Sequence, residues 1–304
     1  MKILKKIILT FLVILFLALC GGYIYFDQKF TPEKNYLTVE KESGPIPIMW
    51  LGKEKNVLLL PIHFDGDTTT YYLQFDTGSP YTVFYSKSIK NIRPIISGKK
   101  VAKTSFRIGQ TKVASNKFKI YNQGNDHDKD SLKIIGTLGA DILEDRKTII
   151  NFKENSIALN VSEVPSQFQS KLFDFKFKKR KIILKGLLKG QEEKFLFDTG
   201  TSAYELLTNK EVWENMKLPN SKIDVEKSEQ SWDNVLTTYT ASCRENIQIA
   251  KREIPLNTVT YVEGFSQAQY SMMKFSGMTG MLGNKIFLNN ILYIDCKENR
   301  MGIE

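Results

Sequence analysis

The sequence predicts an all-β protein built from two similar halves, preceded by one N-terminal transmembrane helix or signal sequence. Three observations carry this prediction. The chain begins with an apolar stretch, an Asp-Thr-Gly tripeptide occurs twice after strand-like runs, and the segments around the tripeptides repeat in the same order. Hydrophobic residues make up 42% of the 304 residues and aromatic residues 12%, which is enough for a packed core in each half.

The N-terminus predicts a membrane anchor. Residues 7–26 are almost wholly apolar and follow a cluster of lysines. About 20 apolar residues can span a bilayer, and lysines before them predict a cytoplasmic N-terminus. We therefore expect residues 1–26 to be a single-pass anchor at the cell membrane, with the remaining chain extracytoplasmic (periplasmic or extracellular). A cleaved signal sequence and a lipoprotein attached through Cys20 are alternatives, and all three export the halves.

The first half is expected over residues 56–161, after a polar tether with one or two strands over residues 27–55. Two strand-like runs around a Gly turn lead into Asp76. Beyond it, residues 105–113 read as two strands around a second Gly turn. Such a hairpin is either a lid over a site or part of a sheet, and both interpretations fit the sequence.

The second half is expected over residues 182–304, after a connection over residues 162–181. That connection ends in the basic cluster 176–181, which fits a solvated strand edge or a contact with anionic lipid headgroups. Extra loop material and a candidate helix at residues 209–216 lengthen this half. Its aromatic residues either line a substrate groove or pack internally: Trp232, Tyr261, Phe265 and Tyr270.

The two motif copies are Asp76-Thr77-Gly78-Ser79 and Asp198-Thr199-Gly200-Thr201. One copy would be weak evidence, because Asp and Gly are ordinary turn residues. Two copies in repeated halves predict that each half contributes one carboxylate to a common site. Two carboxylates in one site cannot both ionise cheaply, so such a pair would hold one proton over a broad pH range.

Two further segments repeat after the motifs. A Gly-x-Leu-Gly segment occupies residues 136–139 in the first half and 280–283 in the second. Each half then closes on two strand-like runs around a Lys-Glu-Asn turn, which predicts a hairpin in each half.

These motifs resemble those of the aspartic protease superfamily, and the short halves and the Gly-x-Leu-Gly segments are most similar to retropepsin-like domains of bacterial proteins. The resemblance covers about residue 56 to the end. It implies a bilobal pepsin/retropepsin-like fold with lobes related by a pseudo-twofold axis. It also implies a membrane-tethered aspartic endopeptidase, in which Asp76 and Asp198 activate a water that hydrolyses a peptide or protein substrate. No metal or organic cofactor is expected, and a monomer is expected because both lobes lie in one chain.

The resemblance also implies roles for the neighbouring residues. The threonines of the motifs would cross-link the two loops, the glycines would let backbone N–H groups approach the carboxylates, and the last hydroxyl of each motif would bind a carboxylate oxygen. These residues are Thr77, Gly78 and Ser79 in the first loop, and Thr199, Gly200 and Thr201 in the second. A hydrophobic-hydrophobic-Gly stretch supports each loop in the family. Here its copies end in Ile135-Gly136 and in Thr279-Gly280, and Thr279 departs from the pattern.

Other chemistries have little support in the sequence. His63 and His127 are isolated, and the acidic loop at residues 125–130 lacks the Gly and terminal Glu of a calcium loop. Cys243 and Cys296 pair only if their β-carbons meet, which the sequence leaves open. The net charge of +10 is spread along the chain without a recognition motif, so nucleic acid is not an expected partner. The alternative function is a catalytically silent peptide-binding or envelope scaffold module with the same fold.

Overall fold

The structure is a computed structural model, and it describes every residue except 1, 126–131, 232–233, 268–269 and 271–275. His127 and Trp232 lie outside the described residues. The chain divides into two compact units, Met1–Lys34 and Asn35–Glu304.

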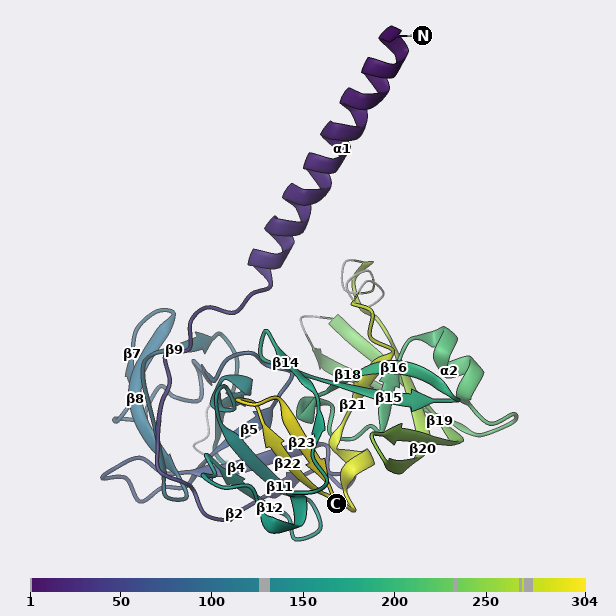
Figure 1. The fold of residues 1–304 in the computed structure, drawn as a ribbon. Helices are drawn as coiled ribbons and strands as arrows, with labels where there is room; N and C mark the ends of the chain where they lie inside the picture. Colours follow the sequence, from purple (N-terminus) through teal and green to yellow (C-terminus); the bar gives the residue numbers. More distant parts are fainter. Residues whose placement is uncertain (1, 126–131, 232–233, 268–269, 271–275) are drawn as a thin grey trace. The chain divides into compact units, whose positions relative to one another are not determined.

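The first unit is dominated by the helix α1 (Lys2–Lys29), drawn in purple in Figure 1. At about 1.5 Å per residue, its 28 residues exceed the roughly 30 Å of a bilayer's hydrocarbon core. Most of its described apolar side chains are exposed, which suits a lipid environment better than water. α1 is therefore long and apolar enough for a membrane span or a signal sequence.

The second unit consists mostly of β-strands, as predicted. Its first sheet has nine strands in the order β3-β4-β5-β10-β6-β9-β8-β7, with β1 paired to β9. The strands are β1 (Thr38–Glu40), β3 (Met49–Leu51), β4 (Val57–Ile62), β5 (Tyr71–Asp76), β6 (Val83–Tyr85), β7 (Ile96–Ser97), β8 (Val101–Ile108), β9 (Thr111–Tyr121) and β10 (Ile134–Gly139).

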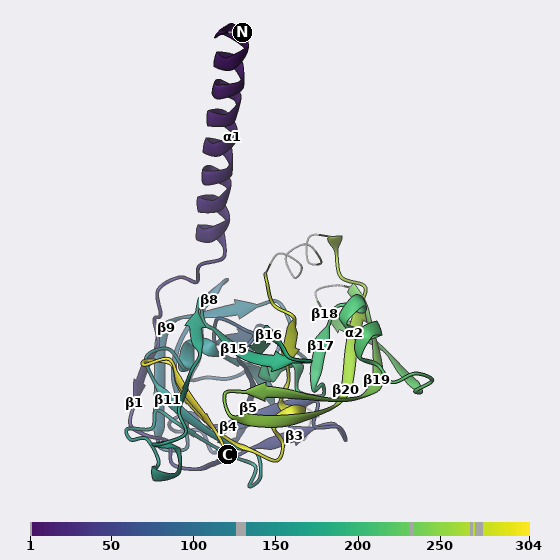
Figure 2. The same cartoon turned by 45° about the vertical axis from the view of Figure 1, so that its right-hand side comes forward.

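The second sheet repeats this order with strands from the second half, β14-β15-β16-β21-β17-β20-β19-β18, and several of them are labelled in Figure 2. They are β14 (Lys176–Lys178), β15 (Lys181–Leu188), β16 (Gln191–Phe197), β17 (Leu206–Thr208), β18 (Ile223–Ser231), β19 (Asn234–Ile249), β20 (Arg252–Glu263) and β21 (Gly280–Leu282). In each sheet the strand that leads into the Asp pairs in parallel with the Gly-x-Leu-Gly strand, β5 with β10 and β16 with β21. The sequence repeat is thus a repeat of topology.

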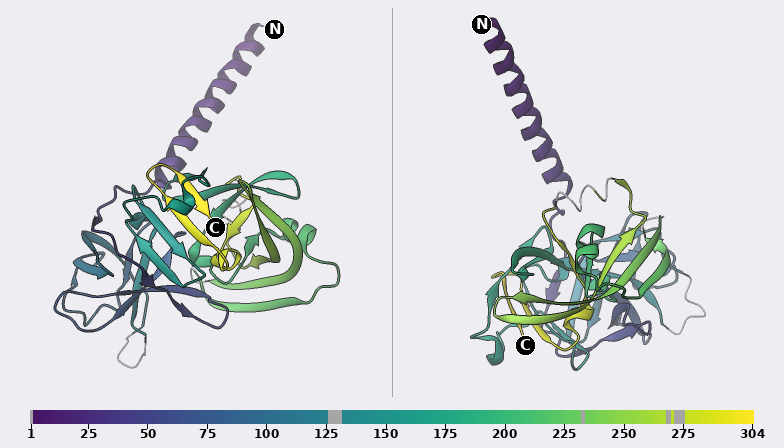
Figure 3. Two further views of the ribbon diagram at one scale, coloured as in Figure 1. Left: turned by 60° about the horizontal axis from the view of Figure 1, so that its bottom comes forward. Right: turned by 90° about the vertical axis from the view of Figure 1, so that its right-hand side faces the viewer.

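A third, six-stranded sheet joins the halves in the order β13-β23-β22-β11-β12-β2. β11 of the first half pairs with β22 of the second, and Figure 3 shows the yellow C-terminal strands beside teal strands of the first half. The strands are β2 (Ile46–Pro47), β11 (Lys147–Asn151), β12 (Ser156–Leu159), β13 (Phe173–Asp174), β22 (Ile291–Asp295) and β23 (Arg300–Ile303). The two predicted closing hairpins are confirmed, with Asn155 and Asn299 at positive φ in their turns.

Short helices occupy the ends of several strands. The predicted helix at residues 209–216 is confirmed as α2 (Lys210–Met216), whose first turn is capped by the Asn209 side chain accepting from the Val212 N–H at 2.9 Å. The 3-10 helices are η1 (Ala140–Ile142), η2 (Ser166–Phe168), η3 (Thr199–Thr201) and η4 (Asn284–Phe287). Residues 173–174 and 176–178, expected in the connection between the halves, are the strands β13 and β14.

One hydrophobic core continues through both halves and fixes the strands that carry the motifs. Phe75 and Phe197, the residues directly before the two Asp side chains, are fully buried. Phe197 packs edge-on against Phe287 at 5.2 Å between ring centroids. Burying one such side chain stabilises the fold by roughly 1.5–3 kcal/mol, so both loops start from rigid positions.

The hairpin expected as a lid or as part of a sheet is part of a sheet. β8 and β9 lie inside the first sheet, and Ile108 and Val113 beside their turn are fully buried. The Gln110 N–H in the turn donates to the Ser43 carbonyl at 3.1 Å. These contacts hold the turn down, and the lid interpretation is therefore wrong for this hairpin.

Candidate catalytic site

Each motif Asp lies at the end of a strand that the Gly-x-Leu-Gly segment holds in place. Asp76 ends β5 and lies opposite Gly139 in the parallel pairing with β10. Asp198 follows β16, and its N–H donates to the Leu282 carbonyl of β21 at 2.9 Å. The backbone of both acids is therefore fixed by equivalent strands in the two halves.

The motif threonines link the two loops by reciprocal hydrogen bonds. The Thr77 N–H donates to Thr199 Oγ1 at 2.9 Å, and the Thr199 N–H donates to Thr77 Oγ1 at 3.0 Å. Each hydroxyl then donates to the carbonyl before the opposite Asp, Thr77 to Phe197 at 3.0 Å and Thr199 to Phe75 at 2.8 Å. Both threonines are fully buried. Because unsatisfied buried groups are costly, these bonds lock the loops together.

The motif glycines bring each loop against the carboxyl group of the other. A β-carbon added at Gly78 would lie 2.6 Å from Asp198 Cγ, and one added at Gly200 would lie 2.7 Å from Asp76 Cγ. No side chain fits at such distances, so only glycine permits this approach. Each half therefore places its motif glycine against the carboxyl group of the other half, in keeping with the repeated topology.

The two carboxyl groups are brought toward each other, because Gly78 packs against the Asp198 carboxyl and Gly200 packs against the Asp76 carboxyl. A carboxylate only accepts hydrogen bonds, so the two groups can hydrogen-bond to each other only when one of them carries a proton. Asp76 Oδ1 also accepts from the N–H groups of Gly78 and Ser79 at 2.8 and 3.1 Å. Asp198 Oδ1 accepts from the Gly200 N–H at 2.8 Å. The backbone thus orients both carboxyl groups.

Burial governs the protonation of the pair. It raises the pKa of Asp76, against the opposing hydrogen bonds from Ser79 and Gly78. Burial, and then the negative charge of Asp76, raise the pKa of Asp198 to about 7. Since the two titrations belong to the pair, the pair keeps one proton over the acidic to near-neutral range.

The supporting residues lie directly behind the loops. A β-carbon at Gly136 would overlap the Val83 carbonyl, and one at Gly280 would lie 2.5 Å from the Leu207 carbonyl oxygen. Ile135 beside Gly136 is fully buried. These glycines allow close approach of neighbouring strands.

Thr279, the departure from the apolar pattern, is satisfied by polar partners. Its N–H donates to the Lys194 carbonyl at 2.8 Å, and its hydroxyl donates to the Glu193 carboxylate. Its carbonyl accepts from the Thr208 hydroxyl at 2.5 Å. The second half therefore uses hydrogen bonds where the first half uses apolar packing.

The hydroxyl groups of Ser79 and Thr201 do not bind the carboxylates as expected. The Ser79 hydroxyl donates to the Tyr81 carbonyl at 2.9 Å, and the Thr201 hydroxyl donates to the Asp198 carbonyl at 2.9 Å. The backbone N–H groups already occupy the inner face of each carboxyl group. The hydroxyls therefore stabilise the loop turns.

A further buried acid, whose role was not predicted from the sequence, supports the first loop. Asp141 follows the Gly-x-Leu-Gly segment and accepts from both the N–H and the hydroxyl of Thr82 at 2.7 Å. In the second half Asn284, one position earlier after the repeated segment, donates to the Thr199 carbonyl at 3.3 Å and to Ser202 Oγ at 2.9 Å.

Two members of the basic cluster 176–181 were also missed. Arg180 is only 3% exposed and forms an ion pair with Glu144 at 3.0 Å, so a solvated strand edge is the wrong description for this residue. Lys181 donates from Nζ to the Gly78 carbonyl at 3.3 Å, inside the first Asp loop. Charge alone gives no signal for such contacts, because they depend on which loop the turn meets.

The aromatic residues considered for a substrate groove make contacts with other aromatic side chains. Tyr261 is buried, stacked on Tyr239 at 4.6 Å between ring centroids and edge-on to Trp213 at 4.7 Å, which is the packing interpretation. Phe265 and Tyr270 contact each other edge-on at 5.7 Å.

The structure also shows how the two cysteines of the second half are arranged. Cys243 and Cys296 are separate buried thiols and do not pair. In the described part of the chain, no group of three or more His, Cys, Asp or Glu side chains is arranged to hold a metal ion.

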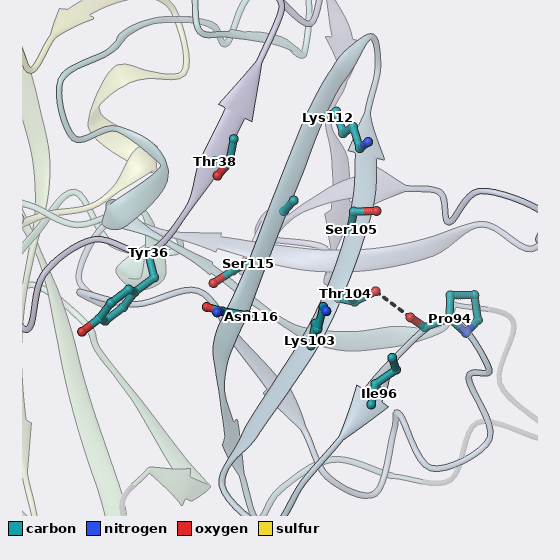
Figure 4. A pocket seen from close by; sticks show the side chains of 11 residues that line it. Tyr36, Thr38, Pro94, Ile96, Lys103, Thr104, Ser105, Lys112, Ser115 and Asn116 are labelled. Carbon is teal, nitrogen blue, oxygen red and sulfur yellow. Dashed lines mark hydrogen bonds between the residues drawn. The ribbon is translucent and has the colours of Figure 1, made fainter.

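A groove of about 590 Å³ is lined mainly by residues of β8 and β9 and by no residue of either Asp motif (Figure 4). Tyr36, Lys103 and Lys112 contribute to it, and Thr104 donates to the Pro94 carbonyl at 2.9 Å beneath it. Besides lysines and short polar side chains, Tyr36, Pro94 and Ile96 line it.

No protein-family model and no curated protein matches the chain. Its function is therefore inferred from the carboxyl pair and the loops that hold it.

Proposed function

We propose that this chain is an aspartic endopeptidase with a bilobal pepsin/retropepsin-like fold, and that Asp76 and Asp198 are its catalytic residues. The close approach of the two Asp loops carries this proposal, since equivalent loops of two halves contribute one acid each and each loop's glycine packs against the other carboxyl group. The matching strand order of the two halves and the sheet that they share support the bilobal fold. The reciprocal threonine bonds support a site built at the junction of two lobes.

The chemistry follows from a pair that shares one proton. The ionised carboxylate takes a proton from a water molecule, and the resulting hydroxide attacks the peptide carbonyl carbon. The protonated carboxyl gives its proton to the carbonyl oxygen, forming a neutral tetrahedral diol. Collapse of the diol returns one proton to the pair and transfers another to the leaving nitrogen, which breaks the C–N bond. Each proton transfer typically contributes about 10²–10⁴-fold to the rate.

The surroundings of the pair suit this cycle. The glycine N–H groups hold the carboxyl groups in place before substrate binds, so little reorganisation is needed during proton transfer. The raised pKa of Asp198 keeps a proton available at mildly acidic and near-neutral pH. Neither acid is assigned as the sole base, because the titrations belong to the pair.

The N-terminal helix sets where the enzyme acts in this proposal. α1 would tether the catalytic unit to the cell membrane with its lobes extracytoplasmic, and lipid attachment at Cys20 would give a similar arrangement. The substrates would be exported or envelope peptides and proteins. Since both acids lie in one chain, a monomer suffices for catalysis.

A peptide-library digest tests the proposal. The full-length protein in detergent micelles is incubated with a diverse peptide library from pH 3 to 8, and products are identified by mass spectrometry. We expect endoproteolytic cleavage that a statine-type transition-state mimic inhibits and that Asp76→Asn and Asp198→Asn each abolish. Asp174→Asn, a substitution of an acid that is 88% exposed, is the matched control and should cleave normally.

The same experiment addresses the alternative of a silent peptide-binding or scaffold module. A folded wild-type protein that retains peptides but releases no products at any pH would contradict the peptidase and favour that alternative. Cleavage that persists in both Asn variants would point to a contaminating protease.

A further inference from the structure

The turn between β14 and β15 places basic side chains against the first Asp loop. Lys178 pairs with Lys181, so Lys179 and Arg180 alone form the turn. Their φ angles are 54° and 57°, in the left-handed region that two-residue turns usually fill with Asn and Gly. This conformation costs roughly 1–2 kcal/mol for each such residue, so contacts around the turn must hold it.

Arg180 supplies those contacts. Its guanidinium donates to Glu144 Oε2 from Nε and Nη2 at 3.1 and 3.0 Å, and from Nη1 to the Pro80 carbonyl at 3.1 Å. It also lies over the Tyr81 ring, 5.3 Å from the centroid. These partners belong to the first half, whereas the turn belongs to the second sheet. Arg180 therefore fixes the turn against the segment that follows the first Asp motif.

The next residue, Lys181, is half-buried and points its ammonium into that loop. Nζ donates to the carbonyl of Gly78, the glycine that packs against the Asp198 carboxyl. Among the residues that the structure describes, the Tyr85 phenol of β6 also faces the pair from a neighbouring element, and it is hydrogen-bonded to the Thr137 hydroxyl at 2.7 Å. Lys181 is thus the cation seen beside the pair in the described part of the chain.

We propose that Lys181 is a positioning residue of the Asp76/Asp198 site, held by the Arg180 turn so that its ammonium stabilises the singly ionised carboxyl pair. The inference rests on the proposed function and deepens it. A positive charge beside two acids favours loss of a proton at both steps, so it moves the pH window of the active form downward.

The electrostatics of the pair agree with this geometry. The charge of Lys181 lowers the pKa of Asp76 and the pKa of Asp198, against the burial that raises both. Without the ammonium, both titrations of the pair would lie at higher pH.

The first test is the pH profile of kcat/KM for a cleaved library peptide, using full-length protein in micelles. In Lys181→Met we expect both limbs to move to higher pH, with kcat/KM on the acid limb lower by roughly threefold to tenfold. Lys181→Arg should keep the wild-type profile. Lys185→Met, on the same strand but 66% exposed, is the matched control for losing one lysine and should also keep it. An unchanged profile in active Lys181→Met would overturn the inference and leave the peptidase proposal intact.

A second readout does not need activity. The carboxyl carbons of [γ-¹³C]aspartate-labelled protein are titrated by NMR, with Asp76 and Asp198 assigned through their Asn variants. We expect the pair to titrate at higher pH in Lys181→Met, with Lys181→Gln as a second neutral variant if Met disturbs folding. If Lys181→Met moves the titration but the wild-type protein cleaves no peptide, the role of Lys181 is supported and the peptidase is rejected. Unmoved titrations in both neutral variants would reject the role of Lys181.

Discussion

At the scale of single residues, Thr199 shows how one side chain fixes the loops of both halves. Its hydroxyl accepts from the Thr77 N–H and donates to the Phe75 carbonyl, and all three groups are buried. Neither bond is available to a side chain without a hydroxyl. The position of each carboxyl therefore depends on a residue in the other half.

We expect Thr199→Val to destabilise the protein by about 2–4 kcal/mol, because it leaves a buried donor and a buried acceptor without partners. Thr199→Ser keeps the hydroxyl and should cost less than about 1.5 kcal/mol, the loss of one methyl group. Urea denaturation of the two variants gives the difference. Equal stability of Val and Ser variants would mean that the reciprocal bonds contribute little.

Replacing Gly200 tests whether the close approach of the two Asp loops is needed for activity. The β-carbon of Gly200→Ala would overlap the Asp76 carboxyl, so the loop must shift and separate the pair. We expect kcat/KM to fall by at least about 100-fold, since misplacement by about 1 Å can cost that much. Gly98→Ala, in an exposed turn with its nearest contact at 3.2 Å, is the comparison and should retain activity.

The sequence was most informative at this scale where residues repeat. Asp76, Asp198 and their Thr-Gly neighbours were identified because each appears twice in the same setting, and the structure brings these six residues together. The hydroxyls of Ser79 and Thr201 were misplaced, because the sequence does not reveal that backbone N–H groups already satisfy the carboxyl oxygens.

At the scale of elements, the β14–β15 hairpin connects the second sheet to the first Asp loop. Its turn residues adopt a left-handed conformation that the buried Arg180 contacts stabilise. The segment 162–181 was expected only to connect the halves. Its last residues could not be assigned to a site because their role depends on a tertiary contact with residues about a hundred positions earlier.

We expect Arg180→Met to destabilise the protein by about 2–4 kcal/mol, because it breaks a largely buried ion pair and removes a hydrogen bond to the Pro80 carbonyl. Arg300→Met breaks an ion pair of the same type, with Asp174, whose side chains are 44% and 88% exposed. That control should change stability by less than about 1 kcal/mol. Similar losses in both variants, measured by chemical denaturation, would show that burial of Arg180 is unimportant.

For the hairpin β8–β9, the sequence predicted the strands but not their role. Alternating apolar residues and a Gly turn identified two strands, which the structure confirms. The pattern is the same for a free lid and for a central part of a sheet, so the choice depended on partners elsewhere. Here those partners are the Ser43 carbonyl at the turn and the pairing of β9 with β1 and β6.

At the scale of the whole molecule, the repeat explains why the site lies where the halves meet. Two equivalent sheets end their Asp strands at matching positions, and the third sheet pairs β11 with β22 across the halves. The mostly β composition and the apolar helix followed from patterning and were predicted correctly. The shared sheet was not predicted, because pairing between distant strands leaves no local signal.

The raised pKa of Asp198 makes stability depend on pH. The folded pKa of about 7 exceeds the value of 3.8 for a free carboxyl, so the folded state binds more protons between these limits. The free energy of unfolding should then fall as pH rises from about 4 to 7, by up to about 1.4 kcal/mol per pH unit for one proton. Denaturation of Asp198→Asn across this range should lack that slope. A wild-type protein whose stability rises with pH in step with the variant would contradict the raised pKa.

The most direct measurement of the central claim is a double-mutant cycle on kcat/KM with Asp76→Asn, Asp198→Asn and the double variant, at the pH optimum of the wild type. Groups that act as one unit lose their function together. We predict that each single variant loses at least about 10⁴-fold and that the double variant loses no more than either single one. A single variant that retains activity within about tenfold of the wild type would contradict a shared-proton pair and the mechanism built on it.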